Sequence, residues 1–110
     1  MKTRSEVKPN YAPLYAGALY PDLAKVFVKH GYALAVHGSL ARDIDLIAVP
    51  WDKNVSSIED VIQAVNETFA VKIIGEPEVK NYGRLAYTLV LGFGECSIDL
   101  SFLPALTPLT

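Results

Sequence analysis

The sequence predicts an α+β fold, with one mixed β-sheet, helices packed on one side of it, and the element order α-β-β-α-β-β-β. Two segments carry apolar residues at helical spacing, and several short runs alternate or are apolar throughout, as strands are. The chain has 110 residues, of which 51% are hydrophobic and 20% charged, a composition typical of a globular protein. We therefore expect a single domain over residues 1–110, with residues 1–12 as a loose N-terminal arm.

Two helices are expected before and after the first pair of strands. Pro21 is favourable as the first residue of the earlier helix, and Gly31 as the cap that ends it. Its apolar face is formed by residues at i, i+3, i+4 and i+7, namely Leu23, Val26, Phe27 and His30. Residues 13–20 predict only a short helical turn. The later helix begins at a capping box, either Ser56 with Glu59 or Ser57 with Asp60, and continues to about Phe69.

Five strands are expected, over residues 32–36, 43–49, 71–74, 84–91 and 96–103. Gly75 and Pro77 break the third strand, residues 81–83 form a turn, and residues 92–95 form a hairpin turn. In the fifth strand Asp99 shares a face with Ser97 and Ser101, while the other face is apolar. A charge in a strand that is expected to be central is costly unless it is paired or bound to a metal.

A pair of carboxylates, Asp43 and Asp45, opens the second strand and is the strongest functional signal in the chain. Side chains alternate along a strand, so these two acids are expected on one face. Two such carboxylates stay ionised together most easily with a cation between them; a solvated acidic turn is the alternative. If the fifth strand lies beside the second, then Asp43, Asp45 and Asp99 converge, and three carboxylates can hold two divalent cations.

The Gly38-Ser39 turn lies directly before these acids and can present backbone N–H groups and a hydroxyl to phosphates. Arg42 has two equally weighted interpretations, a direct phosphate ligand or a salt-bridge partner of Asp43 or of a surface acid. His37 either borders the site or packs at the strand end.

Weaker candidates lie elsewhere in the chain. Trp51 either stacks on a base or covers the core, and the second role is the more common one for a tryptophan in a loop after a core strand. Lys80 and Arg84 flank the turn at 81–83 and would neutralise phosphate if that turn folds over the site; solvated turn charges are the default. Cys96 is expected to be a buried, inert thiol.

Composition excludes several functional classes. The net charge of −2 argues against non-specific binding of duplex DNA, which needs clustered basic residues. The single cysteine fits a reducing compartment, so we expect a cytoplasmic location. The charged first ten residues do not predict a signal peptide, and no apolar run is long enough to span a membrane.

The order Gly-Ser, Asp-x-Asp opening an apolar strand, then a lone Asp on a later strand resembles the DNA polymerase β-like nucleotidyltransferase superfamily. The resemblance covers residues 21–103 and is strongest to the minimal nucleotidyltransferases of bacteria and their phages. It implies that Asp43, Asp45 and Asp99 are catalytic ligands of two magnesium ions. It also implies that Gly38 and Ser39 grip the triphosphate of an NTP.

One feature departs from the family pattern. Only Leu40, Ala41 and Arg42 separate Ser39 from the first acid, whereas the family usually has a longer spacer that opens a short helix. The expected function is magnesium-dependent transfer of a nucleoside monophosphate from NTP to a hydroxyl acceptor that the sequence does not identify. The alternative is a non-catalytic protein of the same fold that binds a nucleotide or a protein partner. An enzyme of this length is expected to need a homo-oligomer or a partner protein to complete its site.

Overall fold

A computed structural model describes residues 10–69, 71–91 and 96–105 of the chain. The predicted order of helices and strands is confirmed. In chain order the elements are α1 (Ala12–Lys29), β1 (Tyr32–His37), β2 (Ile44–Pro50), α2 (Ile58–Thr68), β3 (Val71–Val79), the 3₁₀ turn η2 (Asn81–Gly83), β4 (Leu85–Leu91) and β5 (Cys96–Phe102). The expected hairpin turn at 92–95 and most of the expected N-terminal arm lie outside the described residues.

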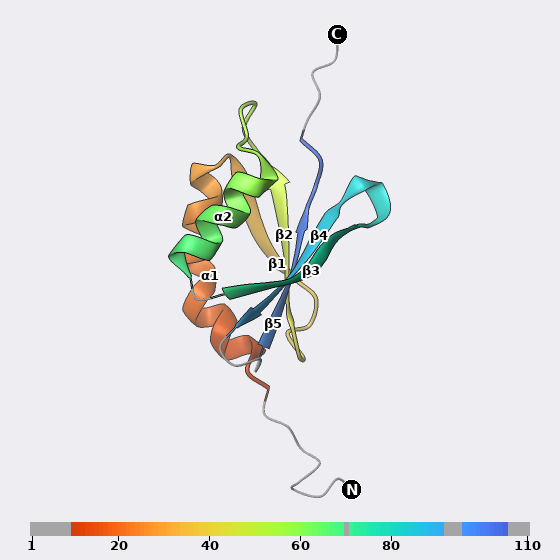
Figure 1. Ribbon diagram of the computed structural model, residues 1–110. Helices are drawn as coiled ribbons and strands as arrows, with labels where there is room; N and C mark the ends of the chain where they lie inside the picture. The colour runs from red at the N-terminus through yellow and green to blue at the C-terminus, as the bar shows by residue number, and fades with distance from the viewer. Residues whose placement is uncertain (1–9, 70, 92–95, 106–110) are drawn as a thin grey trace, which may run out of the picture.

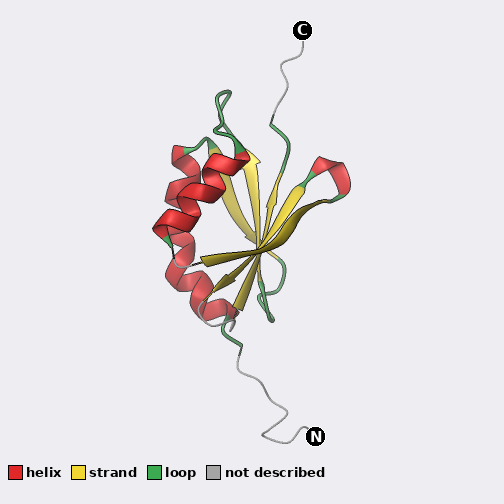
Figure 2. Cartoon of the chain, viewed as in Figure 1, coloured by secondary structure: helices red, strands yellow, loops and turns green. Residues whose placement is uncertain are grey.

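The five strands form one mixed sheet in the order β1-β2-β5-β4-β3. The neighbours β2 and β5 are parallel, and the other three strand pairs are antiparallel. Both helices lie against the same face of the sheet, and no described helix or strand covers the other face, which is called the uncovered face below (Figures 1 and 2). This arrangement confirms the predicted α+β fold with helices on one side, and it makes β5 the central strand.

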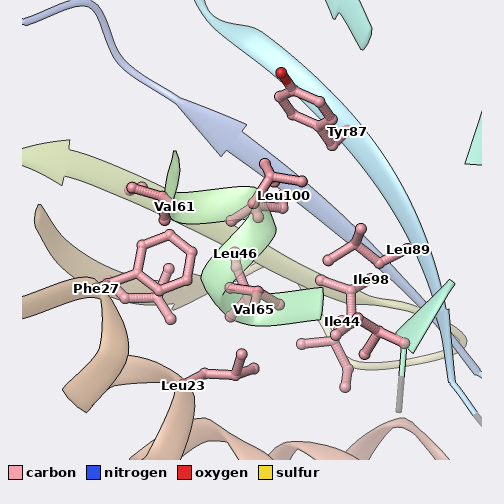
Figure 3. Packing of buried hydrophobic residues seen from close by; sticks show 14 of the residues in the cluster. Leu23, Phe27, Ile44, Leu46, Val61, Val65, Tyr87, Leu89, Ile98 and Leu100 are labelled. Carbon is pink, nitrogen blue, oxygen red and sulfur yellow. The ribbon is translucent and has the colours of Figure 1, made fainter. Parts of the chain in front are cut away.

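Alternation along the strands assigns apolar residues to the helix-covered face. In β2 every second residue, beginning with Ile44, is buried, and the residues between them are half-buried. Figure 3 shows how residues of the two helices pack against β2, β4 and β5, including Leu23, Phe27, Val61, Val65, Leu46, Ile98 and Leu89. The ring of Phe102 lies 5.8 Å from that of Phe27 and 5.5 Å from that of Tyr32. The remaining strand positions therefore face the uncovered side.

The first helix differs from the prediction, because the expected short turn and the expected helix are one continuous element. α1 begins at Ala12, inside the expected arm, and Pro13 occupies its first turn, while Pro21 lies inside the helix. A proline there removes one backbone hydrogen bond and usually ends or kinks a helix. The physical reason that the helix continues is burial, since Ala12 is 0% and Ala16 9% exposed against the core. None of the helices in the described ranges is long and apolar enough to cross a bilayer.

Ser57 caps the start of α2, and its side-chain oxygen accepts a hydrogen bond from the Asp60 backbone N–H at 3.2 Å. Of the two predicted capping pairs, this is the one that forms. The Ser56 hydroxyl is instead 2.8 Å from Nδ1 of His30. That contact ties the end of α1 to the start of α2.

The two edges of the sheet are built differently. β3 does not stop at Gly75 as predicted; it continues to Val79 through a shift of register between Ile74 and Glu78. A bulge absorbs the residues that the sequence suggested would break the strand. On the opposite edge, the hydroxyl of Tyr20 in α1 donates a hydrogen bond to the backbone carbonyl of Leu34 in β1.

Candidate functional site

Two of the three predicted acids lie side by side on the uncovered face of the sheet. In the parallel register of β2 and β5, Asp45 is the partner of Asp99. Asp45 is half-buried and Asp99 is exposed. Within the described residues, no lysine, arginine or histidine forms an ion pair with either carboxylate. Two like charges on neighbouring strands, without such a partner, repel each other and favour a bound cation.

Asp43 lies just before β2 and not within it. β2 begins at Ile44, and residues 41–43 form a bend, so strand alternation does not hold Asp43 on the same face as Asp45. The bend is held near the start of β5, because the Cys96 thiol donates to the carbonyl oxygen of Arg42 at 4.0 Å. Asp43 therefore lies near the beginning of the strand that carries Asp99, outside the paired row.

The carboxylate of Asp45 packs directly against Gly38. A side-chain carbon at Gly38 would overlap Oδ2 of Asp45, and Gly38 has a φ of +74°. Both facts favour glycine at this position, since other residues rarely adopt that backbone conformation and a side-chain carbon would displace the Asp45 carboxylate. The Gly-Ser turn thus lies in contact with one member of the acid pair.

Residues 38–43 contain no helix, as the short spacer predicted. Ser39 Oγ accepts a hydrogen bond from the Ala41 backbone N–H at 3.2 Å. Leu40 has a φ of 56°, is half-buried, and packs against the core. Its carbonyl oxygen accepts a bond from the side-chain amide of Asn10 at 2.9 Å. The turn is anchored by packing and by local hydrogen bonds.

Arg42 is exposed and forms no ion pair with Asp43 or with another acid of the described residues. The salt-bridge interpretation of Arg42 is therefore not seen in this structure. His37 is exposed and is the partner of Asp45 in the antiparallel register of β1 and β2. It borders the acid pair on the side opposite Asp99.

On the far side of Asp99, the next strand adds polar and basic groups. Thr88 of β4 is the partner of Asp99. Nη1 of Arg84 lies 3.4 Å from the hydroxyl oxygen of Ser101, which is 3% exposed and faces the same side as Asp99. Lys80 forms an ion pair with Glu78 at 2.8 Å, and the hydrogen bond and charge of Glu78 raise the pKa of Lys80. The negative charge of Asp99 raises it further, which places Lys80 within electrostatic reach of the acid pair.

Trp51 does not cover the core, and that part of the prediction is wrong. Its side chain is 83% exposed, at the end of β2 remote from Asp45. It lines an open surface pocket of about 430 Å³ together with residues of α1, β1 and the loop, namely Val28, Gly31, Tyr32, Ala33 and Asp52. The pocket is separate from the acid pair, because β2 runs from one to the other.

Cys96 is buried, as predicted. Burial raises the pKa of its thiol, and the charge of Asp43 raises it further. A thiol whose pKa is raised in this way stays protonated at neutral pH and is a weak nucleophile. Cys96 therefore has a structural role at the start of β5.

Asp45 and Asp99 fit magnesium by the chemistry of their donor atoms. Carboxylate oxygens are the ligands that Mg²⁺ prefers, and one or two carboxylates with water and substrate phosphates are its usual set. Asp45 and Asp99 supply two. No group of three histidine, cysteine, aspartate or glutamate side chains in the described part of the chain is arranged to hold a metal ion. The described residues therefore show the pair Asp45 and Asp99, and no metal-binding group of three acids.

Comparison with known proteins supports the fold. No family model matches the chain, and no curated protein matches it. Among solved structures, the chain is similar to the Cid1 poly(U) polymerase, in a crystal form with Mg and 3′-dATP bound. The match has a TM-score of 0.55 and 19% sequence identity, and it covers 87% of this chain and 32% of that one. The chain thus spans about a third of the polymerase and shares the nucleotidyltransferase-like fold of that part.

Proposed function

We propose that this protein is a magnesium-dependent nucleotidyltransferase, which moves a nucleoside monophosphate from NTP to a hydroxyl acceptor. The observation that carries the proposal is the pairing of Asp45 with Asp99 on the uncovered face, with Gly38 in contact with Asp45. The shared fold with a poly(U) polymerase supports it.

Asp45 and Asp99 would hold the cation, and Asp43 would join them from its bend once a substrate is bound. Bound there, Mg²⁺ would supply the positive charge that stabilises a transferring phosphoryl group and activates the attacking hydroxyl. The turn at Gly38 and Ser39 would bind the terminal phosphates through backbone N–H groups, and the exposed Arg42 would add a charged contact.

In the proposed reaction the acceptor hydroxyl oxygen attacks the α-phosphorus of the NTP. The bond between the α-phosphorus and the bridging oxygen breaks, and pyrophosphate leaves. The hydroxyl proton passes to Asp99, which is the more exposed of the paired acids.

A non-catalytic nucleotide-binding role is the second candidate. Two observations favour it: no helix lies between Ser39 and β2, and no group of three acids in the described part of the chain is arranged to hold a metal ion. Both candidates require cation and nucleotide binding, and only the first requires transfer.

The test has a binding arm and a transfer arm. For binding, we expect Mn²⁺ or Mg²⁺ at tenfold above its Kd to stabilise the protein by about 1.4 kcal/mol, read as a rise in Tm. The variant Asp45→Asn should lose this rise and should have a slightly higher Tm without cation, because it removes one of two adjacent like charges.

For transfer, labelled NTP is incubated with the protein and a cell extract. Asp45→Asn and Asp99→Asn should each lower incorporation by about 100-fold or more. The matched control is Asp22→Asn, an exposed acid of α1 whose loss should leave incorporation unchanged. Equal incorporation by wild type and Asp45→Asn contradicts the proposed chemistry. Cation and nucleotide binding without incorporation into any acceptor supports the non-catalytic candidate.

A further inference from the structure

We propose that the tip of the β3–β4 hairpin, residues Lys80–Arg84, binds the acceptor, and that the acceptor is the end of a single-stranded nucleic acid. This inference rests on the proposed function and names the substrate class that receives the nucleotide. In the strand order, the tip belongs to β3 and β4 on one side of β5, and the Gly-Ser turn follows β1 on the other side.

The first observation is an aromatic ring held in solvent. Tyr82 is 91% exposed, and its backbone has a φ of 64° and a ψ of 25°. This left-handed conformation is unfavourable for a residue with a side chain, by about 1 kcal/mol. The ring contributes nothing to the core that would offset that cost, whereas an exposed aromatic face is a stacking surface for a base.

The second observation is an arginine without an acid partner. Arg84 is half-buried and lies against Ser101, and it forms no ion pair within the described residues. A guanidinium has five N–H donors, and the contact with Ser101 uses one of them. The others are free to bind a phosphate in the two-point geometry for which arginine is well suited.

The third observation links the tip to the acid pair. Ser101 is two residues beyond Asp99 on the same face of β5, and the charge of Asp99 contributes to the raised pKa of Lys80. A phosphate held by Arg84 would therefore lie beside the acid that is proposed to accept the hydroxyl proton. Transfer of a nucleotide to a hydroxyl at Asp99 would require the end of the strand there.

The tip is closed by a backbone hydrogen bond and lies close to Pro104. The Lys80 backbone N–H donates to the Arg84 carbonyl at 2.7 Å, and a side-chain carbon at Gly83 would lie 3.2 Å from Cγ of Pro104. Figure 1 shows the tip and the loop after β1 both on the side of the sheet away from the helices. The proposed acceptor site and nucleotide site thus flank one face.

The charge of the region selects a strand end over a duplex. Glu78 compensates Lys80, and the whole chain carries a net charge of −2. Arg84, the basic residue of the tip without an acid partner, can bind one phosphate, and the exposed ring of Tyr82 can stack on one base. A duplex would instead require a broad basic surface.

The test measures strand binding without transfer. Fluorescence anisotropy of a 5′-labelled single-stranded 12-mer, in EDTA and without NTP, gives Kd for the wild type and the variants. Tyr82→Asn should raise Kd about tenfold, since asparagine keeps the left-handed backbone but removes the ring, while Tyr82→Phe should retain binding. Arg84→Gln should raise Kd about tenfold and lower the slope of log K against log[salt] by about 0.7, and Arg84→Lys should restore part of both.

Lys25→Gln, on the helix-covered side, is the control for loss of a charge and should bind as the wild type does. Circular dichroism and the fluorescence of the single tryptophan report that each variant is folded. Equal Kd values for wild type, Tyr82→Asn and Arg84→Gln overturn the inference, as does the absence of strand binding by the wild type.

The transfer assay separates this inference from the proposed function. Incorporation of label into a protein or a small hydroxyl compound, without strand binding, overturns the acceptor assignment alone. Strand binding that needs Tyr82 and Arg84, with no incorporation into any acceptor, upholds the tip as a strand-binding element and overturns the proposed transfer.

Discussion

The carboxylate of Asp45 occupies the space that a side chain at position 38 would fill, and Gly38 has no side chain. Gly38 adopts a left-handed φ and leaves room for the carboxylate of a residue seven positions later. The glycine therefore has two separable roles, one in the turn and one in the placement of the acid. Gly38→Ala affects both roles together, and the same substitution at Gly75 measures the backbone cost alone.

We predict that Gly38→Ala lowers the free energy of unfolding by about 1–2 kcal/mol and weakens binding of Mn²⁺. The added carbon strains the backbone and displaces the Asp45 carboxylate. Urea denaturation measures the first effect, and electron paramagnetic resonance of free Mn²⁺ measures the second.

Gly75→Ala is the matched control, because Gly75 has a φ of +68° and nothing within 4 Å of an added carbon. It should lose about 1 kcal/mol of stability and bind Mn²⁺ as the wild type does. If Gly38→Ala binds Mn²⁺ with unchanged affinity, the contact between Gly38 and Asp45 does not position the acid.

At the scale of single elements, local signals determined what the sequence could predict. Helical spacing and the serine cap located α2, and alternation assigned the two faces of β4 and β5. Local sequence signals predicted the wrong helix boundary where burial against the core determined the length of the helix. Pro21 suggests a helix start, yet the burial of Ala12 and Ala16 extends α1 through it.

We predict that Ser57→Ala lowers the free energy of unfolding by about 1 kcal/mol, because the backbone N–H of Asp60 loses its capping partner. Ser57→Asp should be close to neutral, since its carboxylate can accept the same bond and favours the positive end of the helix. Thermal unfolding of the three proteins checks this. Equal loss in both variants would show that the hydroxyl stabilises α2 by some other means.

At the scale of the whole molecule, the candidate site depends on pairing between distant segments. The sequence predicted which acids form the site, but it left open whether the strands of Asp45 and Asp99 were neighbours. That pairing depends on how the apolar faces of β2 and β5 pack under both helices. The contact of Arg84 with Ser101 was likewise beyond prediction, because it joins β5 to the start of β4 across the sheet. The bend at Asp43 was missed because Ile44, one residue later than expected, begins the strand.

We predict that stability decreases as the pH rises above about 8.5. Burial raises the pKa of Cys96 above its ordinary 9.0, and it raises those of Tyr32 and Tyr87 above 10.0, with added effects of nearby acids. The unfolded chain therefore releases these protons at a lower pH than the folded one. The contribution of these three groups to the free energy of unfolding is full below pH 8.5, and it is lost as the pH rises through their folded-state pKa values.

Urea denaturation between pH 7.5 and 10.5 measures this dependence. Cys96→Ala removes the first titration and should flatten the decrease between pH 8.5 and 9.5, leaving the later decrease of the tyrosines. A slope unchanged by Cys96→Ala would contradict a raised thiol pKa.

The hydrogen bond from Tyr20 to the Leu34 carbonyl has a consequence for self-association. An edge strand with free carbonyls is a template on which further chains can polymerise, and β1 offers no proline or charged residue before His37 to prevent it. The hydroxyl of Tyr20 occupies an acceptor in the middle of that edge, and the bulge distorts the edge of β3. We expect removal of this hydroxyl to free the Leu34 carbonyl and to favour fibre growth along β1.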